Sequence, residues 1–358
     1  MKIVSGSANE PLAEKIASRL GVQLSDREIF IFPDGERRVR VLGNFVDEST
    51  IVVEPTAPPA DTNYMELFFL VDALKRSGAE FVTAVVPYLG YQRQDHIFRP
   101  GEAVSLEVII KTLESVGMDK IISLDLHTPK IPDVFTIPMI HLSALPLFAE
   151  KINSLLGPGL SHIANDVRHA QDNFEDANLS SLNESRLPDN DQNSQNGRES
   201  TFNSFASGQS TPVMDSKTVL VSPDMGGIRR IKMLSEMLNG MSYAAIEKNR
   251  DLATGVVTAD KIGEGSITGA KRAMIVDDMI ASGKTIVTAC EVLQSQGVEE
   301  IYVFATHPIF AKEAPEILQG SLAKKIFVTD TVMISKDKLF PKLEVLSVAS
   351  IIAKEIQK

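Results

Sequence analysis

Short apolar segments alternate with segments of helical periodicity along most of this 358-residue sequence. Residues 50–53 and 81–87 predict strands, and residues 62–76 between them predict a helix that ends at Gly78. This alternation is typical of parallel βαβ units. The same pattern resumes near residue 217, so the sequence predicts a duplicated α/β unit.

A polar segment separates the two units. Residues 157–216 are rich in Asn, Ser, Asp, Gln and Gly and lose all hydrophobic periodicity, which predicts a disordered insertion. We therefore expect an N-terminal α/β domain at 1–156 and a C-terminal domain at 217–358, with the last helix as a candidate to pack back on the N-terminal domain. The remaining strands are expected at 2–4, 29–32, 120–124, 219–221, 243–246, 273–276, 300–304, 325–329 and 343–347, and the remaining helices at 12–20, 142–155, 228–238, 286–297, near 315 and at the C-terminus.

Composition narrows the classes of partner. A net charge of -11 argues against general nucleic-acid binding, which needs a basic surface, and favours small substrates at a locally basic site. No stretch reaches the roughly 18 apolar residues of a membrane span, so no membrane partner is expected. The single cysteine, Cys290, excludes an intramolecular disulfide and indicates a packing role in a reducing compartment, with the cytoplasm as the default location.

The most informative stretch is residues 273–288, AMIVDDMIASGKTIVT. It predicts a strand, an anion-binding loop and a helix, with Asp277 and Asp278 at the carboxyl end of the strand. The backbone N–H groups of the loop can turn toward an anion at the positive end of the helix. The carboxylates can accept hydrogen bonds from ribose hydroxyls or hold a hydrated Mg²⁺. Two carboxylates beside a phosphate loop predict a site for a phosphorylated sugar. The loop consists of Ala281, Ser282, Gly283, Lys284 and Thr285.

This stretch has two competing interpretations. The letters GKT at 283–285 suggest a nucleotide P-loop, but that motif needs a glycine at the position of Asp278 and is excluded. A double aspartate at a strand end is also compatible with a solvated turn that caps a helix.

Polar residues follow several other predicted strands. Asp34 and Glu36 form either a simple hairpin tip or acceptors for an adenosine, with Phe32 as a stacking face. Arg93, in the loop 91–105, either binds a polyphosphate or belongs to a surface loop of mixed charge. Strand alternation predicts that Asp125 and His127 point to the same side, where they either contact a metal or phosphate or, in the case of the histidine, belong to a packed or surface position.

The second half carries similar positions. Asp224 and two glycines precede a helix, at a place where a ligand can bind. Lys248 and Arg250 open a glycine-rich segment that extends to Gly269 and is expected to be mobile. As an alternative, these two cations belong to a solvated turn.

The motifs FPDGE, RQD, DLH, SPDMGG, KNR and VDDMIASGKT, in this order, resemble the ribose-phosphate diphosphokinase (phosphoribosyl diphosphate, PRPP, synthase) family over nearly the whole chain except the insertion. The resemblance implies two similar phosphoribosyltransferase-like α/β domains, with mainly parallel sheets flanked by helices and the active site between them. It implies ATP and ribose 5-phosphate as substrates, the ATP on the N-terminal side, and Mg²⁺ as cofactor. It also implies a homo-oligomer built from dimers, with the hexamer as one form.

The resemblance assigns a role to each motif. Phe32, Asp34, Gly35 and Glu36 would bind the adenosine, and Arg93 and Gln94 its phosphates. His127 and Asp224 would position Mg²⁺. Lys248 and Arg250 would be the catalytic cations, and Arg250 would also contact the sugar phosphate. Asp277, Asp278 and the loop Ala281–Thr285, including Ser282, Gly283 and Lys284, would bind ribose 5-phosphate.

The sequence departs from the family pattern in this loop, since Ala281 replaces a frequent acid and Lys284 a usual glycine. A PRPP-consuming phosphoribosyltransferase would share the central motif but would not need the adenosine site. A non-catalytic regulatory subunit would tend to lose residues such as Lys248, Arg250 and Asp277, which are present here.

Overall fold

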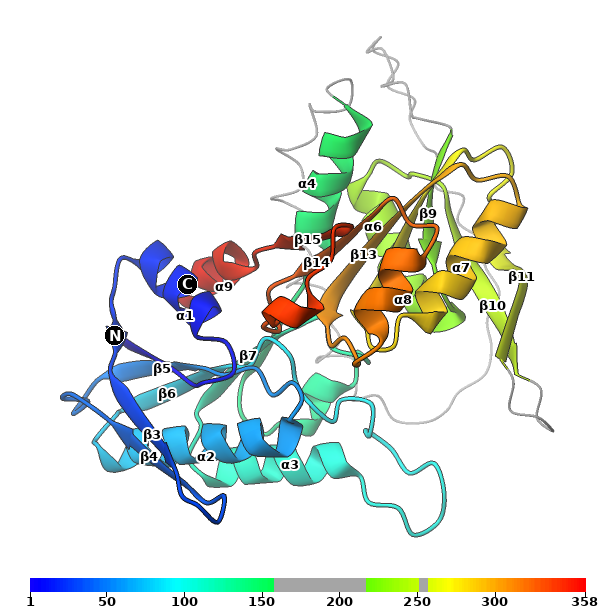
Figure 1. Ribbon diagram of the computed structural model, residues 1–358. Helices are drawn as coiled ribbons and strands as arrows, with labels where there is room; N and C mark the ends of the chain where they lie inside the picture. The colour runs from blue at the N-terminus through cyan, green and yellow to red at the C-terminus, as the bar shows by residue number, and fades with distance from the viewer. Residues whose placement is uncertain (158–216, 251–256) are drawn as a thin grey trace, which may run out of the picture.

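The structure is a computed structural model that describes residues 1–157, 217–250 and 257–358, with only the backbone at 248–250 and 257–261. The predicted insertion at 157–216 therefore lies almost entirely outside the described residues. Within these ranges the chain forms two large sheets flanked by helices, as the sequence predicts (Figure 1).

The N-terminal sheet is parallel throughout and has the strand order β2-β1-β5-β6-β7-β8. Its strands are β1 (Lys2–Ser5), β2 (Leu24–Ser25), β5 (Ser49–Val53), β6 (Phe81–Val85), β7 (Lys120–Leu124) and β8 (Met139–Leu142), and its helices are α1 (Glu10–Leu20), α2 (Ala60–Arg76) and α3 (Ser105–Ser115). Helices α2 and α3 bury apolar side chains against one face, and α1 covers the other. A hairpin of β3 (Arg27–Ile31) and β4 (Arg37–Val41) projects beside this sheet.

The C-terminal sheet has the order β11-β10-β9-β12-β13-β14-β15, and only β11 among its described strands runs antiparallel to its neighbour. The strands are β9 (Thr218–Ser222), β10 (Tyr243–Arg250), β11 (Val257–Gly265), β12 (Arg272–Ile280), β13 (Glu300–Pro308), β14 (Lys325–Thr329) and β15 (Leu343–Leu346). Helices α7 (Lys284–Ser295) and α8 (Ala314–Gly320) cover one face, and α6 (Ile228–Met237) covers the other. Short 3₁₀ helices occur at η1 (Ile131–Val134), η3 (Met225–Gly227) and η4 (Lys336–Lys338).

The two halves exchange helices. Helix α4 (Leu145–Leu156) follows the N-terminal sheet in sequence but packs Phe148 and Ile152 against the C-terminal sheet and α6. Helix α9 (Ala349–Ile356) ends the chain and packs Ile352 against α1, beside the N-terminal sheet (Figure 1). The hydrophobic core clusters therefore do not divide at residue 156. Helix α4, which comes before this point, packs on the C-terminal sheet, and helix α9, which ends the chain, packs beside the N-terminal sheet.

Three local expectations differ from the structure. Strand β12 continues through the two aspartates to Ile280, because Met279 and Ile280 are buried and the strand stays paired with β13. No strand was predicted in the glycine-rich segment 248–269, but residues 257–265 form strand β11, which pairs with β10; residues 251–256 lie outside the described residues, and the mobility of the segment stays a prediction. Helix α3 was not predicted, although Leu106, Ile110 and Leu113 lie at helical spacing and are buried.

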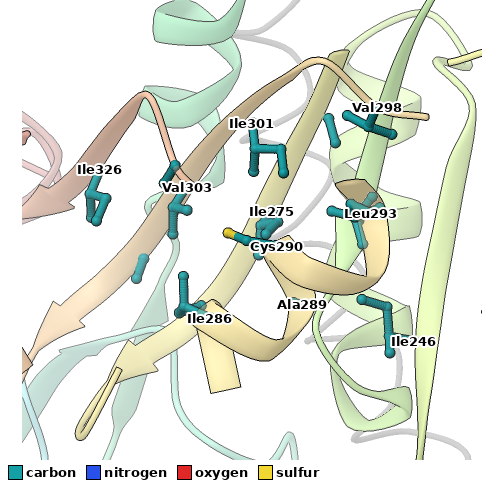
Figure 2. Packing of buried hydrophobic residues seen from close by; sticks show 14 of the residues in the cluster. Ile246, Ile275, Ile286, Ala289, Cys290, Leu293, Val298, Ile301, Val303 and Ile326 are labelled. Carbon is teal, nitrogen blue, oxygen red and sulfur yellow. The ribbon is translucent and has the colours of Figure 1, made fainter. Parts of the chain in front are cut away.

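Cys290 has the packing role that the sequence predicts. It lies on the buried face of α7 between Ile286 and Leu293, against strands β12 and β13 (Figure 2). Burial raises the pKa of its thiol to about 12, so the thiol stays protonated at neutral pH.

Candidate active site

Residues from both sheets meet at the carboxyl ends of the strands. His127 follows β7 in the N-terminal sheet, and Asp277 and Asp278 lie in β12 of the C-terminal sheet. The ring Nδ1 of His127 donates to Oδ2 of Asp278 at 2.8 Å. Because the carboxyl ends of parallel strands carry the ligand sites of open α/β sheets, this contact marks the candidate site. The predicted residues His127, Asp277 and Asp278 are therefore brought together from opposite halves of the chain.

Arg230 joins this cluster from the first turn of α6. Its two terminal nitrogens lie 3.8 Å from Oδ1 of Asp277 and 3.7 Å from Oδ2 of Asp278, and its side chain is 15% exposed. Gly227 makes room for this geometry, since a Cβ there would lie 2.3 Å from the Ser222 hydroxyl and 3.5 Å from an Arg230 nitrogen. Sequence reasoning did not assign Arg230 to the site. One sequence signal could have identified Arg230. It stands three residues after the paired glycines, in the first turn of a helix, and the sequence predicts an acidic strand end as part of the same site.

The pKa values of the two aspartates are shifted in opposite directions. Burial and the neighbouring charge of Asp278 raise the pKa of Asp277 well above its usual range. Burial alone would also raise the pKa of Asp278, but the hydrogen bond from His127 and the charge of Arg230 outweigh it and lower that pKa. The same hydrogen bond raises the pKa of His127 against the opposing effect of burial. The site therefore favours an ionised Asp278 held between an imidazole and a guanidinium, beside a second carboxyl group that can become a ligand.

The anion loop takes the expected conformation at the start of α7. Gly283 has φ 79° and precedes the first helical residue, so the left-handed position carries the one residue type that adopts it freely. A Cβ at Gly283 would also lie 3.0 Å from the Leu318 side chain of α8. Lys284 occupies the first helical position, and its φ is not positive. The family's usual glycine at this position is thus not needed for the backbone here, and the Lys284 side chain is exposed beside the loop.

The predicted metal residues do not form a closed cage. Among the residues with described side chains, no group of three or more His, Cys, Asp and Glu has the arrangement of a preformed metal site. Asp224 lies close enough for its charge to raise the pKa of Asp277. Oxygen donors at Asp224 and Asp277 suit Mg²⁺, which is usually bound by one or two carboxylates together with substrate phosphates and water. The residues present fit such a shared ion.

The residues predicted to bind ATP lie in two places. Arg93 is exposed and lies near enough to His127 to oppose the rise in its pKa, so it belongs to the edge of the cluster. Gln94, next to it, is exposed. The hairpin tip between β3 and β4 holds Asp34, Gly35 and Glu36, and Asp34 accepts from the Glu36 amide at 3.1 Å.

Phe32 at this hairpin is 36% exposed and meets the edge of Phe30 at 4.9 Å, with Arg38 over both rings. Glu36 and Arg37 line a groove of about 460 Å³ with residues of α2, including Asp61 and Met65. The binding of adenosine by Phe32 and residues 34–36 therefore stays a prediction.

Strand alternation predicted that Asp125 points toward a metal or phosphate, and this prediction is wrong. Its φ of 35° breaks the strand geometry, and its carboxylate is buried, accepting from Ser143, the Ala144 amide and Thr306. The turn after β7 is held further by Gln92, whose Oε1 accepts from the His127 amide at 2.8 Å.

Lys248 and Arg250 lie in β10, next to the described end of the strand, and their side chains are outside the description. Their roles therefore stay predictions.

None of the described helices has the length and apolar character needed to cross a membrane.

Comparisons with known proteins match this arrangement. A family profile described as the N-terminal domain of ribose phosphate pyrophosphokinase matches residues 1–117, and one described as the phosphoribosyl synthetase-associated domain matches residues 260–358. The ribose-phosphate pyrophosphokinases of Fusobacterium nucleatum and Thermotoga maritima are each 30% identical over 358 residues, which cover 100% of this chain and 94% of each relative.

A solved structure gives the same result. The crystal structure of phosphoribosylpyrophosphate synthetase from Mycobacterium smegmatis matches with a TM-score of 0.74 and 28% identity, covering 99% of this chain and 97% of the other. The two-sheet architecture and the resemblance of the motifs are thereby confirmed. The chain belongs to the ribose-phosphate pyrophosphokinase family.

Proposed function

We propose that this enzyme transfers the diphosphate of ATP to the 1-hydroxyl of ribose 5-phosphate, giving PRPP and AMP. One observation carries the proposal. Asp277 and Asp278 precede the anion loop Ala281–Thr285 in β12, and the carboxylate of Asp278 lies 2.8 Å from the ring Nδ1 of His127 in the opposite half of the chain. A sugar phosphate held by β12 and α7 would thus lie next to residues of the N-terminal half, where ATP is proposed to bind.

The reaction forms a bond between the anomeric oxygen and the β-phosphorus. The bond between that phosphorus and the oxygen that links it to the α-phosphorus breaks, AMP leaves with this oxygen, and the hydroxyl proton passes to solvent. Catalysis of such a transfer needs alignment and neutralisation of charge rather than a covalent nucleophile. Asp277 would accept hydrogen bonds from the ribose hydroxyls, and Lys248 and Arg250 would stabilise the transferring group.

The remaining roles follow from the position of each residue. The loop amides, Ser282 and Thr285 would bind the 5-phosphate, because they surround the N-terminus of α7. Phe32 and residues 34–36 would bind the adenosine, with Arg93 and Gln94 on its phosphates. His127 and Asp224 would position Mg²⁺, directly or through water, with Asp277 as a further carboxylate beside Asp224. The ion, when bound, would supply positive charge to the phosphate oxygens.

We also propose a homo-oligomer built from dimers, with a hexamer as one form. Phe30, Ile31 and Phe32 are exposed on one hairpin, and such an apolar surface is typical of a protein contact. A cytoplasmic location is proposed from the lone buried Cys290.

The test is to incubate the purified protein with ATP, Mg²⁺ and ribose 5-phosphate and to measure AMP and PRPP by chromatography. We expect both products in equal amounts, and none when ribose 5-phosphate is omitted. Asp277→Asn is the matched variant and should lose most activity. A protein that binds both substrates but forms neither product would be a regulatory subunit, and one that consumes PRPP only with a free base would be a phosphoribosyltransferase.

A further inference from the structure

Asp125 is a buried acid that the proposed mechanism does not use. Its side chain lies at the junction of the two sheets and is 6% exposed. Oδ1 accepts from the Ser143 hydroxyl at 2.8 Å, and Oδ2 accepts from the Ala144 amide at 2.9 Å. Ser143 and Ala144 directly precede α4. Their hydrogen bonds to Asp125 therefore hold the chain at the point where it leaves the N-terminal sheet.

The third donor comes from the other half of the chain. Thr306 of β13 donates its hydroxyl to Oδ2 of Asp125 at 2.6 Å, across 181 residues of sequence. The neighbouring His307 is fully buried, with Nε2 3.4 Å from the backbone oxygen of Asp125 and Nδ1 3.0 Å from the Thr331 hydroxyl. Asp125 is thus bonded to the C-terminal sheet through both its side chain and its backbone.

The conformation of Asp125 determines the direction of the next residues. Its φ of 35° is in the left-handed region, which non-glycine residues adopt only where surrounding contacts hold them. After it, the Leu126 amide donates to Nε2 of His141 at 2.9 Å and the His127 amide donates to Gln92 at 2.8 Å. This turn presents the His127 ring to Asp278 in the other sheet.

We propose that Asp125 and Thr306 form a positioning contact that sets the place of His127 relative to the C-terminal sheet. The inference rests on the proposed function for its catalytic consequence. Without the Thr306 hydroxyl, Oδ2 of the buried carboxylate loses its donor from β13, and only the longer contact of His307 with the backbone oxygen of Asp125 still ties the strained turn to that strand. His127 would then be displaced from the substrates, while the contacts of the other residues with the substrates stay unchanged.

The decisive variants change only the hydroxyl. Thr306→Val keeps the shape but removes the donor, and Thr306→Ser keeps the donor. We expect valine to lower kcat about tenfold with both KM values within about twofold, and serine to restore kcat to within about twofold. In a His127→Ala background, Thr306→Val should cause no further fall, because the contact acts through His127. A similar fall in both backgrounds, or no fall in either, would overturn the proposal.

A second readout does not depend on catalysis. Hydrogen exchange of the peptide that contains the Leu126 and His127 amides should become at least tenfold faster in Thr306→Val and stay normal in Thr306→Ser. Thr112→Val is the matched control, because its exposed hydroxyl donates only within α3 in the described contacts. Unchanged exchange in Thr306→Val overturns the positioning contact even if the protein makes PRPP. Absence of PRPP synthesis in the unmodified protein would overturn only the proposed function.

Discussion

Lys284 is the first residue of α7 and lies directly after the left-handed Gly283. The φ angle of Lys284 is not positive, so a lysine fits this position without backbone strain. Its side chain is exposed, and the ammonium can approach a phosphate at the helix N-terminus. We expect Lys284→Met to raise the KM for ribose 5-phosphate about tenfold and to leave the KM for ATP within twofold. Substrate titrations at fixed Mg²⁺ measure both values. Lys111→Met, on the exposed face of α3, serves as the control, and an unchanged KM would leave the loop amides, Ser282 and Thr285 as the phosphate ligands.

Arg230 acts on the same site through its charge. The charge of the guanidinium opposes the rise that burial causes in the pKa of Asp277 and, after the hydrogen bond from His127, helps to lower the pKa of Asp278. In Arg230→Met both pKa values should therefore rise, so the carboxyl groups become protonated at a higher pH. We expect the acidic limb of the pH profile of kcat/KM to move to higher pH, with at least a tenfold loss of activity near pH 6. An acidic limb at the unchanged position would show that Arg230 does not tune the pair.

At the scale of elements, the hairpin of β10 and β11 carries the two proposed catalytic cations. Lys248 and Arg250 lie on β10, which pairs antiparallel with β11 and projects from the edge of the sheet (Figure 1). The base of this hairpin, including Ile246, is buried in the core, and the part beyond it can bring cations to a bound substrate.

We expect Lys248→Ala and Arg250→Ala each to lower kcat on the order of 100-fold while ATP binding weakens little, because the charges are needed mainly as the diphosphate moves. Steady-state kinetics and equilibrium titration with ATP separate the two effects. Lys261→Ala on the opposite strand is the matched control. A variant with unchanged kcat would exclude that residue from the mechanism.

At the scale of the whole molecule, the exchange of α4 and α9 ties the two halves together. Helix α9 covers the same face of the N-terminal sheet as α1, and Asp330 between the halves accepts from Lys15 at 2.7 Å and, through its backbone oxygen, from Asn9 at 2.8 Å. These contacts, of which the one from Asn9 is buried, join the two halves of the chain close to the candidate site.

The contribution of α9 can be measured with Ile352→Ala. Ile352 is fully buried beside α1, so its truncation should cost about 2–5 kcal/mol and should speed hydrogen exchange in α1, which lies more than 300 residues earlier. Ile351→Ala on the same helix is the control and should cost less, since Ile351 is only partly buried. Equal destabilisation by both variants, with α1 unaffected, would show that α9 does not stabilise the N-terminal half.

The sequence alone determined the local structure, that is, most of the helices and strands and the anion loop between β12 and α7. Periodicity predicted most helices and strands, and the order of residues around Asp277 and Gly283 predicted an anion loop, because strand, loop and helix signals act over a few neighbouring residues. The contact of His127 with Asp278, the reversed direction of Asp125 and the place of Arg230 between two carboxylates were decided only in the tertiary structure. These features depend on how two sheets pack, and burial and neighbouring charge, which set the pKa values of Asp277 and Asp278, exist only after that packing.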